Sequence, residues 1–309
     1  MHLNFRELPG HTMNKSRVIS PVLLTCAAAL ASVALSAGDE VDKTLAASGN
    51  GLVKIDNTRG KVEIIGWDKD EIHITGELDD LAEELIFEVK GDRALIKVKL
   101  SQRNINWGDG SDLEIHLPRG SRVDFDGVST DTRVVSVLGG LRARSISGFI
   151  RAGEIENQVQ INTVSGDIDV TDASGKVRIA TVSGDVHLEM TSSDAVFDTV
   201  SGDIEAEFSE FSSLRSTAVS GDVEVRGKLT ADGTVEMSSV SGDITFEVLS
   251  PVSGHLSIHT GVGGDITNNL SDHEPNDRFP FSKELEASLG DGSANIRLHT
   301  VSGDIRIDD

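Results

Sequence analysis

The chain has 309 residues, and its 51 acidic against 28 basic side chains give a formal net charge of −23 at pH 7. Such an acidic chain has no basic patch for a phosphate backbone, so nucleic acid is excluded as a partner, and an anionic membrane surface would repel it. Aromatic residues are few, with ten Phe, two Trp and no Tyr, whereas 31 Gly indicate tight turns and small core positions.

The first 37 residues have the layout of a secretory signal peptide. A short basic segment that begins at Met13 precedes an apolar, Ala-rich run over 18–33, and small residues up to Ala37 offer a cleavage site. We therefore expect an exported protein of the periplasm or cell surface, with Met13 as an alternative start. An uncleaved signal would act as a membrane anchor, and otherwise membrane contact would need a partner.

The chain has one cysteine, Cys26, which lies inside this segment. Leu23-Leu24-Thr25-Cys26 is a weak match to a lipoprotein cleavage site, because Thr before the Cys is unfavourable and the apolar run continues beyond it. Cleavage after Ala37 would leave no thiol, so the mature chain must be stable without a disulfide or a Cys-ligated metal.

Residues 38–120 alternate apolar and polar positions in short runs, which predicts an all-β N-terminal module. The runs cover residues 52–55, 61–65, 71–74, 85–89, 94–98 and 113–117. Turn sequences separate them, and only 78–85 has a pattern suited to a short helix.

From residue 121 to 309 the pattern Val-Ser-Gly-Asp-Ile/Val returns again and again, which predicts a fold built by repetition. The Gly position is held by Gly148, Gly166, Gly184, Gly202, Gly221, Gly242, Gly264 and Gly303. The first copies are 18 residues apart, and the later spacings grow slowly. A regular period is typical of repeat architectures, in which each unit buries its apolar side against its neighbours.

Two strands of about five residues and two turns fit into one repeat at about 3.3 Å per strand residue. This predicts a flattened parallel β-solenoid, similar to a β-helix or β-roll, with one coil per repeat. The alternative is an antiparallel meander folded into a β-sandwich. A solenoid stacks each Val and Ile on its copy in the next coil about 4.8 Å away, whereas a meander alternates their direction.

The last interval of the repeat is the longest and contains an excursion at 267–293. Phe279 and Phe281 flank Pro280 within it. This composition predicts a segment that packs on a coil or covers an exposed edge of the solenoid.

Strand alternation predicts that Val164, Gly166 and Ile168 face the core and that Ser165 and Asp167 face solvent. The outward carboxylates would then form a binding stripe at Asp167, Asp185, Asp203, Asp222 and Asp243, continued by Asp265 and Asp304. Two such charges about 4.8 Å apart repel by roughly 1 kcal/mol in water, so the oxygens of the stripe need partners.

Three interpretations of the stripe remain open. Each Asp accepts hydrogen bonds from Ser hydroxyls or turn amides, the row holds divalent cations such as Ca²⁺, or the row binds a cationic or polyhydroxylated partner. Calcium-binding β-rolls follow G-G-x-G-x-D, and a Gly directly before Asp departs from that pattern. His255 and His259 share one face of an expected strand but have no third metal ligand near them in the sequence.

The motif Gly66-Trp67-Asp68, the copies of Thr-Val-Ser-Gly-Asp-Ile and the closing run 298–305 resemble the bacterial putative-adhesin family of β-strand-repeat cell-envelope proteins, a domain of unknown function. The resemblance covers roughly residues 48–309. It implies an exported or membrane-associated protein and supplies no catalytic residue. Phe149 where Asp is usual and Thr130 where Gly is usual predict that the first coils adapt to the N-terminal module.

We expect a non-enzymatic adhesion or interaction scaffold of the bacterial cell envelope, with a protein or glycan of the envelope or surface as its ligand. One alternative is an envelope-stress or regulatory component that senses a ligand through the Asp stripe. Another is a carbohydrate-active β-helix enzyme. We predict no catalytic residue, no metal ligand and, apart from the Ca²⁺ alternative, no cofactor.

Overall fold

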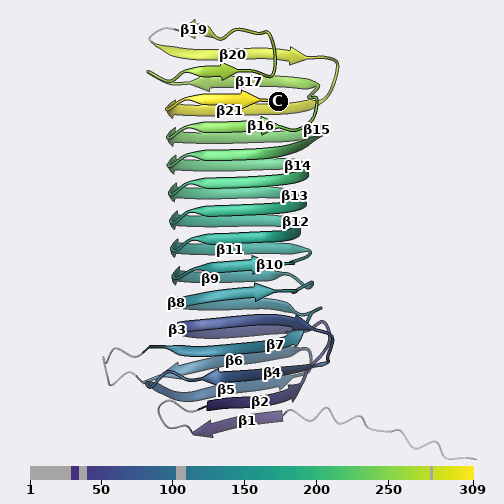
Figure 1. The fold of residues 1–309 in the computed structure, drawn as a ribbon, viewed down its shortest axis with the longest axis vertical. Coiled ribbons are helices and arrows are strands. Elements are labelled where there is room, and N and C mark those ends of the chain that lie inside the picture. The colour runs from purple at the N-terminus through teal and green to yellow at the C-terminus, as the bar shows by residue number, and fades with distance from the viewer. Residues whose placement is uncertain (1–28, 35–39, 102–108, 279–280) are drawn as a thin grey trace, which may run out of the picture.

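The computed structural model describes residues 29–34, 40–101, 109–278 and 281–309. Within these ranges every regular element is a β-strand, and no helix is long and apolar enough to cross a membrane. The strands stack like rungs along the longest axis of the molecule, from purple at the N-terminal end to yellow and green at the other (Figure 1). Residues 1–28, with Met13 and Cys26, lie outside the described part, whereas residues 29–34 of the predicted signal peptide pair with residues 84–89 in the described structure. Cleavage after Ala37 would remove this strand, and the signal-peptide assignment stays a prediction.

The N-terminal strands mix parallel and antiparallel pairing. They are β1 (Ala29–Ala34), β2 (Glu40–Ala46), β3 (Leu52–Trp67), β4 (Glu71–Glu77), β5 (Ala82–Lys90), β6 (Arg93–Leu100) and β7 (Ser111–Pro118). One half of β3 pairs in parallel with β6 and the other half with β7. Beyond them β6, β5 and β1 form one antiparallel flank, and β7, β4 and β2 form the other.

The short helix expected over 78–85 is wrong. Residues 78–81 form a turn, and β5 begins at Ala82. Asp79 determines this turn, because its buried carboxylate accepts the backbone N–H of Leu81 at 2.8 Å and a bidentate contact from Arg59. Asp side chains favour such local turns over helix interiors, since they compete for the backbone donors.

The repeat forms a parallel solenoid, as predicted. Its strands are β8 (Arg122–Val135), β9 (Leu141–Ser147), β10 (Ile150–Gly153), β11 (Gln158–Ser165), β12 (Ile168–Ser183), β13 (Val186–Ser201), β14 (Ile204–Ser220), β15 (Val223–Ser241) and β16 (Ile244–Val248). Ile168 pairs in parallel with Val186, and Val186 with Ile204, so each residue stacks on its copy in the next coil. The antiparallel β-sandwich alternative is therefore wrong.

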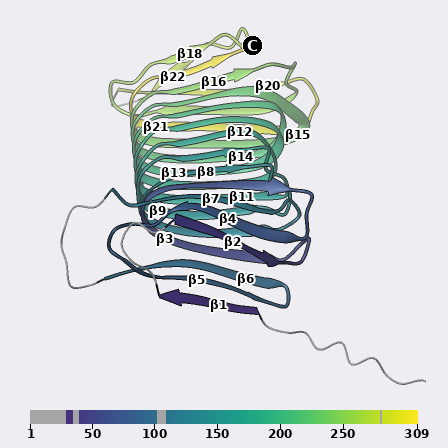
Figure 2. The ribbon, with the colours of Figure 1, turned by 60° about the horizontal axis from the view of Figure 1, so that its bottom comes forward.

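Each coil is a flattened loop of two strand layers that enclose a thin core (Figure 2). In one coil Ile168 and Val170 enter the core from the first layer, and Val177 and Ile179 enter it from the second, each with at most 2% of its surface exposed. Aromatic rings widen the core farther along, where the ring centroids of Phe208 and Phe211 lie 5.0 Å apart. Burial of these stacked apolar side chains supplies the driving force that holds the coils together.

The C-terminal coil is inserted between two earlier coils. The last strands are β17 (Gly254–Thr260), β18 (Ile266–Asn268), β19 (Asn276–Arg278), β20 (Ser282–Leu289), β21 (Ala294–Ser302) and β22 (Ile305–Asp308). β21 pairs with both β15 and β17, and β22 pairs with both β16 and β18. In Figure 1 the yellow β21 accordingly lies below the green β17.

Within the excursion at 267–293, β20 pairs antiparallel with β17, and β19 then pairs with β20. The excursion therefore covers the outer edge of β17. The Phe281 ring does not pack on a coil, because it is 80% exposed. Phe279 lies outside the described residues.

Candidate functional site: the Val-Ser-Gly-Asp edge

Each coil turns from one strand layer to the other at its Val-Ser-Gly-Asp sequence, and the stacked turns form one long edge of the solenoid. Glycine is required at this turn. Gly184 has φ of 145°, and a Cβ placed on it would lie 2.4 Å from the carbonyl oxygen of Gly166 in the neighbouring coil. The eight repeat glycines predicted from the sequence form this column of close backbone contacts: Gly148, Gly166, Gly184, Gly202, Gly221, Gly242, Gly303 and Gly264 in spatial order.

The valines of the repeat face solvent, so the expectation that Val164 fills the core is wrong. Val164 is 48% exposed, whereas Thr163 before it is only 5% exposed and Ile168 after the turn only 1%. Thr163 and Ile168 lie an odd number of positions apart, and both face inward, so the turn resets the alternation that holds within a strand.

The exposed apolar residues form a single row, because the Ser residues that follow them pair coil by coil. We call it the valine row: Val128, Ile146, Val164, Val182, Val200, Val219, Val240 and Val301, each 44–53% exposed. The sequence contained a signal for this orientation. Counting in steps of two residues from Val177 and Ile179 leads to Thr181 and not to Val182.

The outward aspartates form a hydrogen-bonded ladder. The Oδ1 atom of each carboxylate accepts the backbone N–H of the Asp in the next coil. The steps are Asp167 to Asp185 at 3.0 Å, Asp185 to Asp203 at 3.0 Å, Asp203 to Asp222 at 2.9 Å, Asp222 to Asp243 at 2.8 Å, Asp243 to Asp304 at 2.7 Å and Asp304 to Asp265 at 2.8 Å. We call this set the aspartate ladder. Turn amides therefore offset part of the repulsion between the carboxylates.

Phe149 and Thr130 mark the N-terminal limit of the ladder. Phe149 occupies an Asp position, so its N–H donates to Asp131 Oδ1 at 3.0 Å, but it offers no carboxylate to Asp167 in the next coil. Its ring is 49% exposed, and the Arg151 guanidinium lies 5.7 Å from the ring centroid. Thr130 is buried and donates to the Asn57 carbonyl in β3, which ties this coil to the N-terminal strands.

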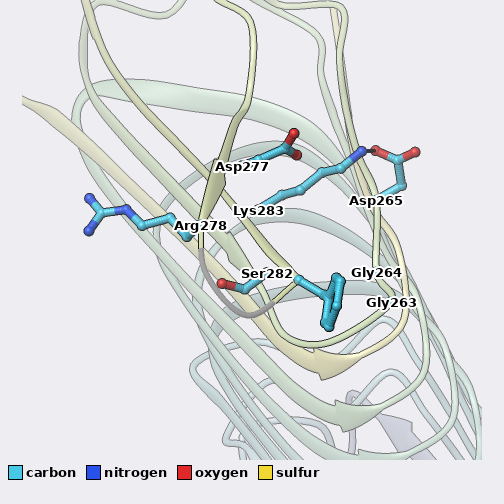
Figure 3. A pocket seen from close by; sticks show the side chains of 8 residues that line it. Gly263, Gly264, Asp265, Asp277, Arg278, Ser282 and Lys283 are labelled. Carbon is cyan, nitrogen blue, oxygen red and sulfur yellow. Dashed lines mark hydrogen bonds and ion pairs between the residues drawn. The ribbon is translucent and has the colours of Figure 1, made fainter.

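Lys283 marks the other limit. Figure 3 shows its side chain reaching from β20 to Asp265, where the ammonium donates to Oδ1 at 2.6 Å. The Lys283 ammonium, together with the Ile266 N–H, holds the pKa of Asp265 below its ordinary value. These residues line an open pocket of about 580 Å³ with Asp277, Arg278 and Phe281. This pairing could not be predicted from the sequence, because Lys283 lies in the excursion outside the repeat.

The surface beyond the aspartate ladder is acidic in its middle part. There the first outward positions are Asp169, His187, Glu205 and Glu224, and a hollow of about 510 Å³ lies among the carboxylates next to Phe149. Beyond the valine row the corresponding positions of the same coils are Asn162, Ala180, Asp198 and Thr217. The surface therefore changes from apolar to acidic across the width of the edge.

In the described ranges no group of three or more His, Cys, Asp or Glu side chains has an arrangement that could hold a metal ion. The ladder carboxylates have their Oδ1 atoms directed at N–H donors, so the Ca²⁺ alternative gains no support from their geometry. His259 packs edge-to-face on His299 with ring centroids 5.2 Å apart, and His255 lies 3.4 Å from the Ser288 hydroxyl.

The chain matches the model of a described protein family. The family model named Toastrack DUF4097 matches residues 52–264, which is more than two thirds of the chain. Among curated proteins, none matches the chain. The match confirms the resemblance inferred from Gly66-Trp67-Asp68 and the repeated Val-Ser-Gly-Asp.

Several solved structures are similar over most of their length. A "putative adhesin" from Bacteroides fragilis is 14% identical and has a TM-score of 0.42, covering 87% of this chain and 97% of that one. A "putative adhesin" from Parabacteroides distasonis is 11% identical with a TM-score of 0.45 over the same shares, 87% and 97%. A "putative lipid binding protein" from the same species is 12% identical with a TM-score of 0.45, covering 89% and 99%. Similarity at this low sequence identity does not identify the ligand of this chain.

Proposed function

The chain belongs to the Toastrack DUF4097 family, and we propose that it is a non-enzymatic interaction scaffold of the bacterial cell envelope that binds its ligand along the Val-Ser-Gly-Asp edge. The valine row carries this proposal. Single exposed apolar residues are normal on a protein surface, but a continuous apolar row beside charged groups marks an interaction site. Eight side chains that are about half exposed follow one edge of a regularly hydrogen-bonded backbone.

The rigidity of the edge supports a scaffold. Glycine contacts and the aspartate ladder fix the position of every turn relative to the next, so the valine row is held in place before any ligand arrives. A preorganised surface loses little conformational freedom on binding, which favours affinity. The ladder carboxylates accept backbone N–H groups, which is a structural role and not that of a general base.

The amino-terminal layout supports export. A basic segment, an apolar run and small residues up to Ala37 are the parts of a secretory signal, and the mature chain would carry its binding edge into the envelope. Fractionation of cells that produce the tagged chain tests this step. We expect the protein in the periplasmic or surface fraction with residues 1–37 removed, and retention of the full-length chain in the cytoplasm would contradict it.

Binding is tested with the purified chain and washed envelope fragments in a sedimentation assay. We expect the triple variant Val182→Ser, Val200→Ser, Val219→Ser to stay in the supernatant while its melting temperature remains close to that of the parent protein. Val89→Ser, Val135→Ser and Val196→Ser make the same change of residue type off the edge, at valines that are more buried, so the melting temperature of this control is measured as well. Equal sedimentation of the edge variant and the control would refute the assignment of the edge.

A further inference from the structure

We propose that the partner of the Val-Ser-Gly-Asp edge is a cationic amphipathic α-helix of another protein, which lies along the solenoid axis with its apolar face on the valine row and its Lys and Arg side chains over the aspartate ladder. This inference rests on the proposed function and adds the chemistry and shape of the ligand.

The charge distribution of the edge favours a partner with positive charge. The described structure gives Asp167, Asp185, Asp203, Asp222 and Asp243 no Lys or Arg partner, whereas Asp265 is paired with Lys283. On the flat faces, by contrast, several cations are paired with acids, as in Arg178 with Asp198 at 3.0 Å and Arg215 with Glu236 at 2.6 Å. Among the described residues these five carboxylates therefore have no cationic partner, and a cationic ligand would supply one.

The valine row selects an amphipathic partner. A simple polycation would neutralise the ladder but leave the apolar row in water, and a neutral glycan would leave the carboxylates without counter-charges. A second copy of this chain would bring its own acidic ladder and a net charge of −23 to the same surface, so like charges would oppose the contact. An apolar stripe flanked by Lys or Arg complements both rows at once.

The spacing between coils favours a helical partner over an extended one. Coils of a parallel solenoid repeat about every 4.8 Å, and an α-helix presents a new turn of its apolar face about every 5.4 Å. The mismatch of about 0.6 Å per turn accumulates to about 2–3 Å over five coils, which flexible Lys and Arg side chains can absorb. Same-side residues of an extended strand along the axis repeat about every 6.8 Å and fall out of register within two or three coils.

The two ends of the ladder bound the docking segment. On one side Phe149 replaces a carboxylate and places Arg151 beside the edge, and on the other Lys283 neutralises Asp265. The uncompensated part runs from Asp167 to Asp304. Its six coils, from Val164 to Val301, span about 24 Å, which corresponds to a helix of about 16 residues.

The proposal is tested with the full chain and three synthetic peptides of about 18 residues, whose binding is followed by fluorescence anisotropy. The first peptide has a Leu stripe flanked by Lys, the second carries Glu in place of Lys, and the third has the composition of the first in an order that gives no apolar stripe. We expect binding of the first peptide alone, weakened by added salt.

Edge variants locate the site. Asp185→Asn, Asp203→Asn, Asp222→Asn together keep an acceptor oxygen for each ladder N–H but remove three charges, and we expect about tenfold to a hundredfold weaker binding. Glu83→Gln, Asp92→Asn, Asp232→Asn remove the same charge from exposed positions off the edge, and we expect less than about a twofold change there. The triple variant Val182→Ser, Val200→Ser, Val219→Ser should also lose binding.

Equal weakening in the two charge variants would show only general attraction to an acidic protein and would overturn the proposal, as would equal binding of the stripe-free peptide. The outcomes also separate the two proposals. If the edge variants lose envelope binding but no peptide binds, the helix inference fails and the scaffold function stands. If peptides bind but the edge variants keep full envelope binding, the peptide site is not the functional surface and the proposed function fails.

Discussion

Replacing Gly184 by Ala should destabilise the solenoid far more than its small size suggests. The added Cβ would lie 2.4 Å from the Gly166 carbonyl oxygen and 2.8 Å from its carbon, both of them backbone atoms of the neighbouring coil. Real Cβ atoms do not approach so closely, and a backbone neighbour cannot rotate away as a side chain does. The two coils must therefore separate locally or the turn must change its φ of 145°.

The magnitude follows from two contributions. An L-residue forced to positive φ loses about 1–2 kcal/mol, and overpacking against a fixed neighbour costs about 1–3 kcal/mol more. The sum of about 2–5 kcal/mol corresponds to a decrease in the melting temperature of about 3–8 °C for a chain of this size.

Thermal unfolding followed by circular dichroism measures this effect. Gly91→Ala is the matched control, because Gly91 also has positive φ, 65°, but a Cβ placed there would meet nothing within 4 Å. The control should lose only the conformational contribution of about 1–2 kcal/mol. If Gly184→Ala melts at the same temperature as Gly91→Ala, the close contact between coils does not limit stability and the reasoning fails.

Three further predictions concern the ladder, a buried ion pair and the inserted coil. Asp203→Ala should lower the free energy of unfolding by about 1 kcal/mol in urea titrations, because the Asp222 N–H loses its acceptor, whereas Asp203→Asn should lose less. Asp79→Asn should destabilise by about 3 kcal/mol at neutral pH, because it breaks the pair with Arg59. Arg59 lowers the pKa of Asp79 in the folded state, so the stabilisation from this pair is complete above the ordinary Asp pKa of about 3.9. It disappears as the pH falls through the lowered pKa. Urea titrations of the parent protein and of Asp79→Asn should therefore give converging stabilities in acid. A chain that ends at residue 290 lacks β21 and β22, so β17 and β18 lose their parallel partners and limited proteolysis should cleave within 250–290, whereas removal of Asp309 alone should have no such effect.

The period of the repeat was sufficient to predict the parallel solenoid. Identical residues at a constant spacing stack in successive coils but alternate in direction in a meander. The pairing of Ile168 with Val186, and of Val186 with Ile204, is what that argument requires. The position of Gly in the motif was likewise informative, because only a residue without Cβ permits turns to stack this closely. The same reasoning identified the aspartates as neighbours.

The prediction that the valines face the core is wrong, because alternation is a property of strands and does not continue through a turn. Counting back from the buried Ile168 in steps of two residues predicts that Val164 faces the core. The preceding strand, however, has its own alternation, in which Val159 and Ile161 are the buried positions. That alternation places Thr163 inside. A functional consequence was missed with it, since the repeat then presents an apolar row to solvent in addition to the carboxylates.

The spatial position of the last coil could not be derived from repeat copies that look alike. Gly264 and Gly303 both carry the motif, and chain order alone would place Gly264 next to Gly242. The antiparallel strand β20 requires the outer edge of β17, so β17 must lie at the end of the stack and β21 fills the space between β17 and β15.

The two ends of the solenoid together determine where a ligand can bind. At the C-terminal end β20 covers β17, and the outermost strand, β19, has only three residues, all exposed and two of them charged. At the N-terminal end antiparallel strands flank β3 on both layers. Short, charged outer strands oppose the addition of another strand to a sheet. Growth is therefore disfavoured at the C-terminal end, and the side of the solenoid offers a surface for recognition, where the valine row and the aspartate ladder extend across successive coils.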